Sequence, residues 1–303
     1  IIDTPKINLD LLFPFKLLKI FYLILHSLIY LKKEKIDKII STGGYMSLPI
    51  CISARLLKIE IYLYEPNFVL GRANKFFLKF CKAIICNTEE IINYPEGYKN
   101  KIRLIPSLVG KKFYDNKKLK NKNEKFCFLV AGGSQGAKIF ENTIHSVIIN
   151  LSKSYKIKII QQTNTKNIIS LKNVYEKANI ENKIFDFEEN FADLISVSDF
   201  CITRAGASTL AELSIMNKPF LAIPLQSSKD NHQFKNALFY ENLNCCWIMS
   251  QKDFNINSLE NFLHKLLKNK SDYNVKKENL KKLNSQNSWN DVNQKILDII
   301  NEN

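Results

Sequence analysis

From residue 36 onward, short runs of β-branched and aromatic residues alternate with stretches that have the period of an amphipathic helix. Such alternation is typical of βαβ units, in which parallel strands form a sheet and the connecting helices cover it. The first series predicts strands at Lys38–Ser41, Ile61–Tyr64, Ala83–Asn87 and Arg103–Ile105, with helices at Ser47–Leu57 and Asn74–Cys81.

A second alternating series follows and is long enough for a complete doubly wound domain, whose ligands bind at the carboxyl ends of the strands. Its predicted strands are Phe126–Ala131, Ile157–Gln161, Lys183–Phe187, Asp199–Thr203, Pro219–Pro224 and Cys245–Ile248. Its predicted helices are near Ala137–Asn150, Ala207–Met216 and Asn231–Leu243.

The length of the chain, 303 residues, is about twice that of a usual domain and predicts two domains. Residues Lys111–Lys125 have almost no aliphatic side chains and are dense in Lys and Asn, as expected of a linker. We therefore expect an N-terminal domain at residues 1–114 and a C-terminal domain at 115–303, with the last helix returning to the first domain. The first series is shorter by about one βαβ unit, so either that domain is small or its beginning is missing.

The charge balance predicts an anionic ligand or surface. Lys and Arg number 44 against 29 Asp and Glu, a formal net charge of +15, which attracts nucleic acid, acidic lipid or phosphorylated small molecules. A nucleic-acid partner is not expected, because the lysines are spread through helices and the linker and do not cluster with aromatic residues on one platform. The seven cysteines include no C-x-x-C pair, which predicts small core residues in a reducing compartment and neither a disulfide framework nor a structural zinc site.

The most apolar stretch, Leu17–Leu31, has 15 residues and includes Lys19, His26 and Ser27. Because about 20 residues are needed to span a bilayer, we expect a helix that packs in a core or lies on a membrane, and no spanning segment. The stretch Asn74–Ile85 also mixes Lys with Phe, Leu and Ile, as interfacial helices do. The alternative is that both apolar faces are buried against a sheet.

A glycine-rich turn, Gly132–Ala137, directly follows the strand Phe126–Ala131. Glycines allow the backbone to approach an anion, and the N-terminus of the following helix offers free N–H groups, so a diphosphate would fit there. The alternative is a tight turn that only packs the helix on the strand.

Two later turns each admit a structural and a ligand-binding interpretation. In Arg204–Glu212, Thr209 and Glu212 have the T-x-x-E spacing of a capping box, which these residues taken alone favour. The alternative is that Glu212 accepts hydrogen bonds from ribose hydroxyls. In the turn after Pro224, Asp230 and Gln233 have capping spacing, and the run of polar side chains also suits a sugar with many hydroxyls.

The first series contains a comparable glycine turn. The strand Lys38–Ser41 leads into Thr42, Gly43, Gly44, Tyr45 and Met46, and Ser47 then has the position to cap the next helix. After the following strand, Glu65 and Asn67, then Gly71 and Asn74, place a carboxylate and amides at a second turn.

Together these motifs resemble the MurG family of peptidoglycan glycosyltransferases, glycosyltransferase family 28. The family moves N-acetylglucosamine from a UDP donor, UDP-GlcNAc, onto a lipid-linked muramyl-pentapeptide. The matching elements, in the family's order, are Gly43-Gly44-Tyr45 with Ser47, Glu65 with Asn67, Gly71 with Asn74, Gly132–Ala137, Arg204–Glu212, and Asp230–Gln233 with Asn236.

The resemblance implies an α/β GT-B fold of two Rossmann-like domains facing across a cleft, with the opening βαβ unit of the first absent. It implies that the second domain binds the donor and the first binds the acceptor. The implied donor contacts are Asn67, Gly133, Ser134, Gly136, Phe187, Glu188, Ala207, Ser208, Thr209, Leu210, Ala211, Glu212 and Gln233, and the implied acceptor-side residues are Gly43, Gly44, Tyr45 and Ser47.

Within this set the resemblance implies that Ser134 contacts the diphosphate, Glu212 the ribose and Gln233 the sugar hydroxyls, with uracil near Phe187 and Glu188. It also implies an inverting transfer without a cofactor or an essential metal, on the cytoplasmic face of a bacterial inner membrane, with an anionic membrane surface and cell-wall synthesis proteins as partners. The family's first Gly-rich loop, which carries a histidine, has no counterpart before Thr42, which leaves Glu65 as the candidate catalytic base. The alternatives are an inactive protein that binds UDP-sugars and a related transferase acting on another glycolipid.

Overall fold

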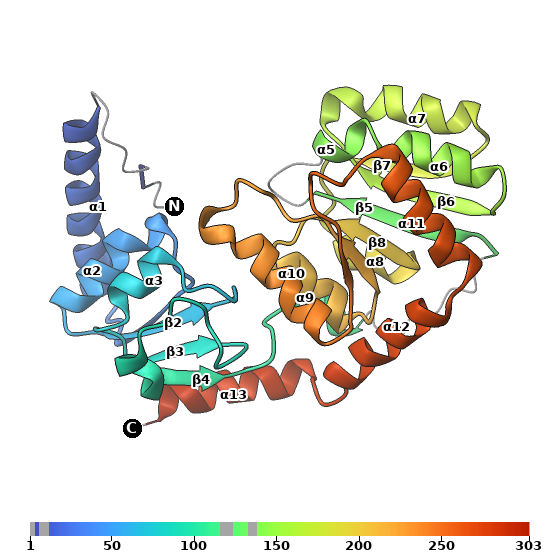
Figure 1. Cartoon of the computed structure of the whole chain (residues 1–303). Helices are drawn as coiled ribbons and strands as arrows, with labels where there is room; N and C mark the ends of the chain where they lie inside the picture. Colours follow the sequence, from blue (N-terminus) through green and yellow to red (C-terminus); the bar gives the residue numbers. More distant parts are fainter. Residues whose placement is uncertain (1–3, 6–11, 116–123, 133–137, 303) are drawn as a thin grey trace. The chain divides into compact units, whose positions relative to one another are not determined.

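The structure is a computed structural model that describes residues 4–5, 12–115, 124–132 and 138–302. The chain divides into two compact units (Figure 1). Unit 1 consists of residues 1–108 and 290–303, and unit 2 of residues 109–289.

In the described part of unit 1, four parallel strands form one sheet in the order β1-β2-β3-β4. The predicted strands are confirmed to within one residue at each end. Their bounds are β1 (Lys38–Ser41), β2 (Glu60–Glu65), β3 (Ala83–Cys86) and β4 (Ile102–Leu104).

Helices pack on both faces of the unit 1 sheet (Figure 1). On one face, α2 (Leu48–Leu56) and α3 (Arg72–Phe77) bury apolar side chains against β2 and β3, and the end of α1 (Phe13–Lys33) joins this core through Leu31. On the other face, α13 (Trp289–Asn301) packs through Ile299, and Tyr62 donates a hydrogen bond to the carbonyl of Ile300 (3.0 Å). Successive side chains of β2 therefore pack alternately into two separate cores, as expected of a sheet covered on both faces.

The described part of unit 2 contains one parallel sheet in the order β10-β9-β8-β5-β6-β7. The predicted strands are confirmed to within two residues at each end. Their bounds are β5 (Phe126–Ala131), β6 (Ile157–Gln162), β7 (Glu181–Phe185), β8 (Phe200–Thr203), β9 (Phe220–Ala222) and β10 (Trp247–Ile248).

The unit 2 sheet is doubly wound. One core packs Cys127 and Leu129 of β5 against α8 (Phe191–Val197), α9 (Ala207–Ile215), α10 (His232–Asn242) and α12 (Ser271–Leu283). The other packs Phe128 and Val130 against α6 (Ile144–Ser152), α7 (Ile168–Lys177) and α11 (Ile256–Lys268). The single helix predicted near Ala137–Asn150 is instead two, α5 (Lys138–Glu141) and α6.

The helix α1 is longer than the apolar stretch that predicts it. It has 21 residues, and the mean hydropathy of its most apolar window is 1.4, so by length and composition it is able to cross a membrane. The expectation that this segment falls short of a spanning length is therefore wrong, because helical residues continue on both sides of Leu17–Leu31. Only 22% of that window is buried.

The seven cysteines are all buried and free, which confirms their interpretation as small core residues. Burial raises the pKa of each of these thiols, for example that of Cys201 to about 12. A thiol with so high a pKa is protonated at neutral pH and is a poor nucleophile or metal ligand.

Phe200 of β8 provides a test of the unit 2 core, because it is fully buried and its ring lies 6.1 Å from that of Phe128 and 5.6 Å from that of Trp247. We expect Phe200→Ala to lower the free energy of unfolding of unit 2 by about 3–5 kcal/mol, through lost burial and the cavity left behind. Urea unfolding followed by tryptophan fluorescence measures this directly, since both tryptophans, Trp247 and Trp289, belong to unit 2. The exposed Ile169 is the matched control, and a comparable loss in Ile169→Ala would contradict the argument.

Candidate functional site

The carboxyl ends of the unit 2 strands open into the loops that carry the predicted donor contacts. Because the strands are parallel, the loops after β5, β6, β7, β8 and β9 all leave the same edge of the sheet. Side-chain hydrogen bonds connect these loops to one another.

The glycine turn begins at Gly132, whose backbone N–H donates to Oε1 of Gln162 at the end of β6 (3.0 Å). The other amide group of Gln162, Nε2, donates to the carbonyl of Asp186 after β7 (2.9 Å). Gly133, Ser134 and Gly136 lie outside the described residues. Their predicted contacts with a diphosphate therefore stay predictions.

The turn after β8 leads directly into α9. This helix begins at Ala207, and Gly206 at its N-cap offers no side chain, so Thr209 lies inside the first turn and the capping-box interpretation of Thr209 and Glu212 is wrong. Leu210 and Ala211 face the core, whereas Ser208 is exposed and Ala207, Thr209 and Glu212 are partly exposed. The first N–H groups of α9 thus have no side-chain cap, a geometry that favours an anion.

Glu212 is the titratable group most altered by this environment. Burial raises the pKa of its carboxyl to about 7, and the positive charge of Lys112 on α4 (Lys111–Asp115) opposes the rise. Lys112 itself donates to the carbonyl of Glu189. Perturbed pKa values are common at functional sites, so Glu212 is a candidate ligand-binding residue at this edge of the sheet.

The turn after β9 is closed by buried amide side chains. Gln233 is 3% exposed, and its Oε1 accepts from the backbone N–H groups of Leu225 (2.9 Å) and Ala205 (3.3 Å). The predicted cap by Asp230 and Gln233 is wrong, because Gln233 lies in the first turn of α10 and the N-cap is Asn231. Asn236 donates to the carbonyl of Ala205 (3.1 Å), so one helix holds the turns after β8 and β9 together.

Arg204 crosses the same edge from the end of β8. Its Nη1 donates to the carbonyl of Ile223 (3.1 Å) and to Oε1 of Gln251 (3.0 Å), and its guanidinium lies 5.7 Å from the centre of the Phe140 ring. Burial lowers the pKa of Arg204, and its Nε has no hydrogen-bond partner in the structure as described.

Phe187 and Glu188 lie beyond the end of β7, which stops two residues earlier than predicted. The Phe187 ring is 81% exposed. Glu188 pairs with Lys183 (2.7 Å) and accepts from the N–H of Asn190 (3.2 Å), and these bonds lower its pKa. The exposed Phe187 ring is accessible for stacking on a planar ligand, whereas the Glu188 carboxylate already binds Lys183 and Asn190.

In unit 1, Glu65 is the centre of the second turn. It is 3% exposed, and its Oε1 accepts from the backbone N–H (3.2 Å) and side-chain amide (3.0 Å) of Asn67. Its Oε2 accepts from the N–H of Gly71 (2.8 Å) and the side-chain amide of Asn74 (2.9 Å). Four donors thus hold this carboxylate and fix the loop that presents Asn67.

The first glycine turn depends on the same Asn74. Gly43 and Gly44 have φ of 78° and 76°, a region that favours glycine, and a Cβ on Gly43 would lie 2.8 Å from Oδ1 of Asn74. Tyr45 is exposed directly after these glycines. Ser47 precedes α2 but makes no cap hydrogen bond, because its hydroxyl donates to the carbonyl of Gly44 (2.8 Å); the predicted cap is therefore wrong.

Among the described residues, no cluster of three or more His, Cys, Asp or Glu side chains is arranged to hold a metal ion. Gln162 and Gln251, whose amide side chains also connect neighbouring loops, were not predicted from the sequence. Their signal in the sequence was only a polar residue at the end of a strand or turn.

Comparison with known families decides the classification. Residues 6–86 match the N-terminal domain of glycosyltransferase family 28, and residues 127–294 match its C-terminal domain. The chain belongs to glycosyltransferase family 28. This confirms the family predicted from the motifs.

Two curated relatives of this family carry the same functional name, UDP-N-acetylglucosamine–N-acetylmuramyl-(pentapeptide) pyrophosphoryl-undecaprenol N-acetylglucosamine transferase. The protein from Pelagibacter ubique is 47% identical over 293 residues, covering 97% of this chain and 82% of the relative. The protein from Rickettsia canadensis is 34% identical over 236 residues, covering 76% of this chain and 67% of the relative.

Solved structures confirm the predicted fold class, α/β with two Rossmann-like domains of the GT-B type. MurG of Acinetobacter baumannii has a TM-score of 0.71 at 24% identity, covering 94% of this chain and 79% of that structure. A UDP-GlcNAc 2-epimerase from Neisseria meningitidis, bound to UDP-GlcNAc, has a TM-score of 0.67 at 13% identity, covering 100% and 84%. At these identities the likeness to the two solved structures concerns the fold alone.

Because the pKa of Glu212 is raised, the free energy of unfolding of unit 2 depends on pH. The folded carboxyl titrates near pH 7 and the unfolded one near 4.5, so its contribution is fully present below about pH 4.5 and is lost as the pH rises toward 7. The loss amounts to roughly 3 kcal/mol at most. We expect Glu212→Gln, a neutral isostere, to unfold at higher urea than the wild type at pH 8 and at the same urea at pH 4.5. A difference that does not vary with pH would contradict the assignment.

Proposed function

We propose that this chain transfers N-acetylglucosamine from UDP-GlcNAc to undecaprenyl-pyrophosphoryl-N-acetylmuramyl-pentapeptide, converting lipid I to lipid II in peptidoglycan synthesis. The observation that carries the proposal is the 47% identity, over 97% of the chain, to a relative named for this reaction. The acceptor hydroxyl attacks the anomeric carbon of the sugar, the bond to the diphosphate breaks, and UDP leaves with the electron pair. The configuration at the anomeric carbon inverts.

The donor is proposed to bind at the carboxyl edge of the unit 2 sheet. The uncapped N–H groups that open α9 favour the negative diphosphate, and so does the glycine turn that starts at Gly132. Ser134 is assigned to the diphosphate, Gln233 to the sugar hydroxyls, and the exposed Phe187 to uracil. Ionised Glu212 is assigned to the paired ribose hydroxyls, since a carboxylate accepts from both.

Proton removal from the acceptor hydroxyl requires a base. Glu65 is the candidate from the sequence, but both its oxygens already accept from Asn67, Gly71 and Asn74. These contacts support a role for Glu65 in positioning Asn67 toward the sugar. Gly43, Gly44, Tyr45 and Ser47 are proposed to contact the acceptor.

The activity test uses the full chain, UDP-GlcNAc and a lipid-linked muramyl acceptor, with product followed by chromatography. We expect lipid II to form, and to form equally in the presence of EDTA, because the backbone donors stabilise the leaving diphosphate without a resident metal.

We expect Glu212→Gln to lower kcat/KM about tenfold to a hundredfold, since hydrogen bonds to a charged group contribute about 1.5–3 kcal/mol. The control Glu176→Gln, an exposed residue that pairs with Lys172 on α7, should leave kcat/KM unchanged.

Three outcomes separate this function from its alternatives. Binding of UDP without product from any acceptor would favour an inactive UDP-sugar-binding protein. Product only with a different glycolipid would favour a related transferase. Activity that EDTA abolishes and Mg²⁺ restores would contradict the metal-free mechanism.

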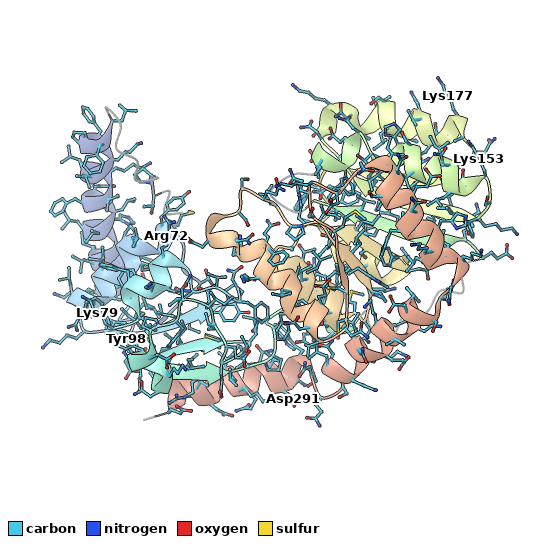
Figure 2. All side chains as sticks on the ribbon, in the orientation of Figure 1. Arg72, Lys79, Tyr98, Lys153, Lys177 and Asp291 are labelled. Carbon is cyan, nitrogen blue, oxygen red and sulfur yellow. The ribbon has the colours of Figure 1, made fainter. Side chains whose placement is uncertain are left out.

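The acceptor carries a polyprenyl chain, so we propose that unit 1 attaches peripherally to the cytoplasmic face of the bacterial inner membrane. Exposed apolar side chains run along α1, and Phe21, Leu25 and Ile29 recur every four residues on one face. Phe76 on α3 is also exposed, and Figure 2 shows Arg72 and Lys79 of this segment projecting outward. Cations near exposed apolar residues suit an anionic lipid surface.

An attached helix fits α1 better than a spanning one, because unit 1 already holds it. Ser53 of α2 donates to the carbonyl of Ile24 (2.9 Å), and Leu31 is 2% exposed in the core shared with α2. A helix that crossed the bilayer would have to give up these contacts.

Vesicle binding tests the attachment. We expect Phe21→Ser combined with Ile29→Ser to weaken binding of the full chain to vesicles containing anionic lipid by about tenfold or more, given about 1.5–3 kcal/mol per buried apolar side chain. Ile169→Ser, an equally exposed position on α7, is the control. An equal loss in the control, or resistance of the wild type to a carbonate wash, would contradict a peripheral α1.

A further inference from the structure

We propose that Gln162 is a positioning residue for the nucleotide: its amide holds the start of the glycine turn and the segment before Phe187 in fixed relation. The inference rests on the donor site proposed above and adds a residue that contacts no substrate itself.

The topology of unit 2 makes this position unusual. In the sheet order, β6 lies between β5 and β7, and Gln162 is the last residue of β6. A side chain there can reach the loops that leave both neighbouring strands. One of these loops carries the predicted diphosphate contacts and the other the predicted uracil contacts.

The two hydrogen bonds of Gln162 satisfy backbone groups that the sheet no longer pairs. The last β6–β7 backbone bond runs from the N–H of Thr163 to the carbonyl of Phe185 (2.8 Å), so the carbonyl of Asp186 lies just beyond the ladder. Gln162 Nε2 donates to that carbonyl, and Gln162 Oε1 accepts from the N–H of Gly132. A side chain amide has both the donor and the acceptor that this bridge needs, whereas a carboxylate or an apolar side chain lacks at least one.

The loop after β6 also contacts α5, the helix that follows the glycine turn in the sequence. Glu141 of α5, a few residues past the turn, accepts from the hydroxyl of Thr163 (2.8 Å) and from the side-chain amide of Asn167 (3.0 Å). Both flanks of the turn are therefore attached to the same carboxyl end of β6. Thr165 completes the connection to β7 by donating to the carboxylate of Asp186.

It follows that removing the Gln162 amide should reduce the contribution of the diphosphate to binding as well as total affinity. The test compares the dissociation constants of UDP and uridine for the full chain by calorimetry, with thermal melting as a check of folding. In Gln162→Met we expect UDP affinity to fall about tenfold and the UDP-to-uridine affinity ratio to fall at least threefold, because the hydrogen bonds to Gly132 and Asp186 are lost. A residue that served only overall stability would leave that ratio unchanged.

Thr165→Val is the matched control in the same loop, because it removes a bond to Asp186 and none to Gly132. We expect its UDP-to-uridine ratio to stay within twofold of the wild type. A ratio preserved in Gln162→Met, or lost equally in Thr165→Val, would overturn the proposal while leaving the donor site intact.

Two further outcomes are informative. If Gln162→Met does not fold, Gln162→Glu keeps an acceptor for Gly132 but no donor for Asp186, and uridine affinity should fall in it; an unchanged uridine affinity would overturn the bridge to Asp186. Failure of the wild-type chain to bind UDP at all would instead overturn the proposed function, and this inference with it.

Discussion

Backbone groups beyond the last rung of a parallel ladder have no strand partner, and in both units polar side chains take that place. Gln162 bridges the loops after β5 and β7, Gln233 those after β8 and β9, and Glu65 holds the loop after β2. Buried polar groups are costly unless hydrogen-bonded, so these side chains largely determine where each loop can go. The groups proposed to contact the ligand lie on these loops, so their positions depend on the same hydrogen bonds.

Glu212 shows that a residue suited to bind a ligand can lower the stability of the fold. Its half-buried carboxyl has a pKa near 7, so ionisation at physiological pH costs folding free energy. Nearby Lys112 limits that cost, and the first N–H groups of α9 have no side-chain cap. Perturbed or unsatisfied groups of this kind gather at functional sites, where a ligand supplies the missing partner.

Short-range patterns predicted the elements well and the roles of individual polar residues poorly. The strands follow from β-branched runs, and β5 was located to the residue. By contrast, the capping interpretations of Thr209 and Gln233 were wrong because the N-caps of α9 and α10 are Gly206 and Asn231. That of Ser47 was wrong because its hydroxyl donates to the carbonyl of Gly44. Helix boundaries are set by packing as much as by local sequence, and a small shift of the first helical residue changes which side chain can act as the cap.

The sequence by itself determined the α/β class, the sheets, the family and the turns that carry the donor motifs, because periodicity and glycine placement are local properties of a chain. Only the tertiary structure decided which side chains meet across those turns. Gln162 and Asp186 are 24 positions apart, and Gln233 and Ala205 are 28 apart. These contacts form because parallel pairing brings the carboxyl ends of strands that are distant in the sequence to one edge of the sheet. A local sequence pattern does not show which strands become neighbours.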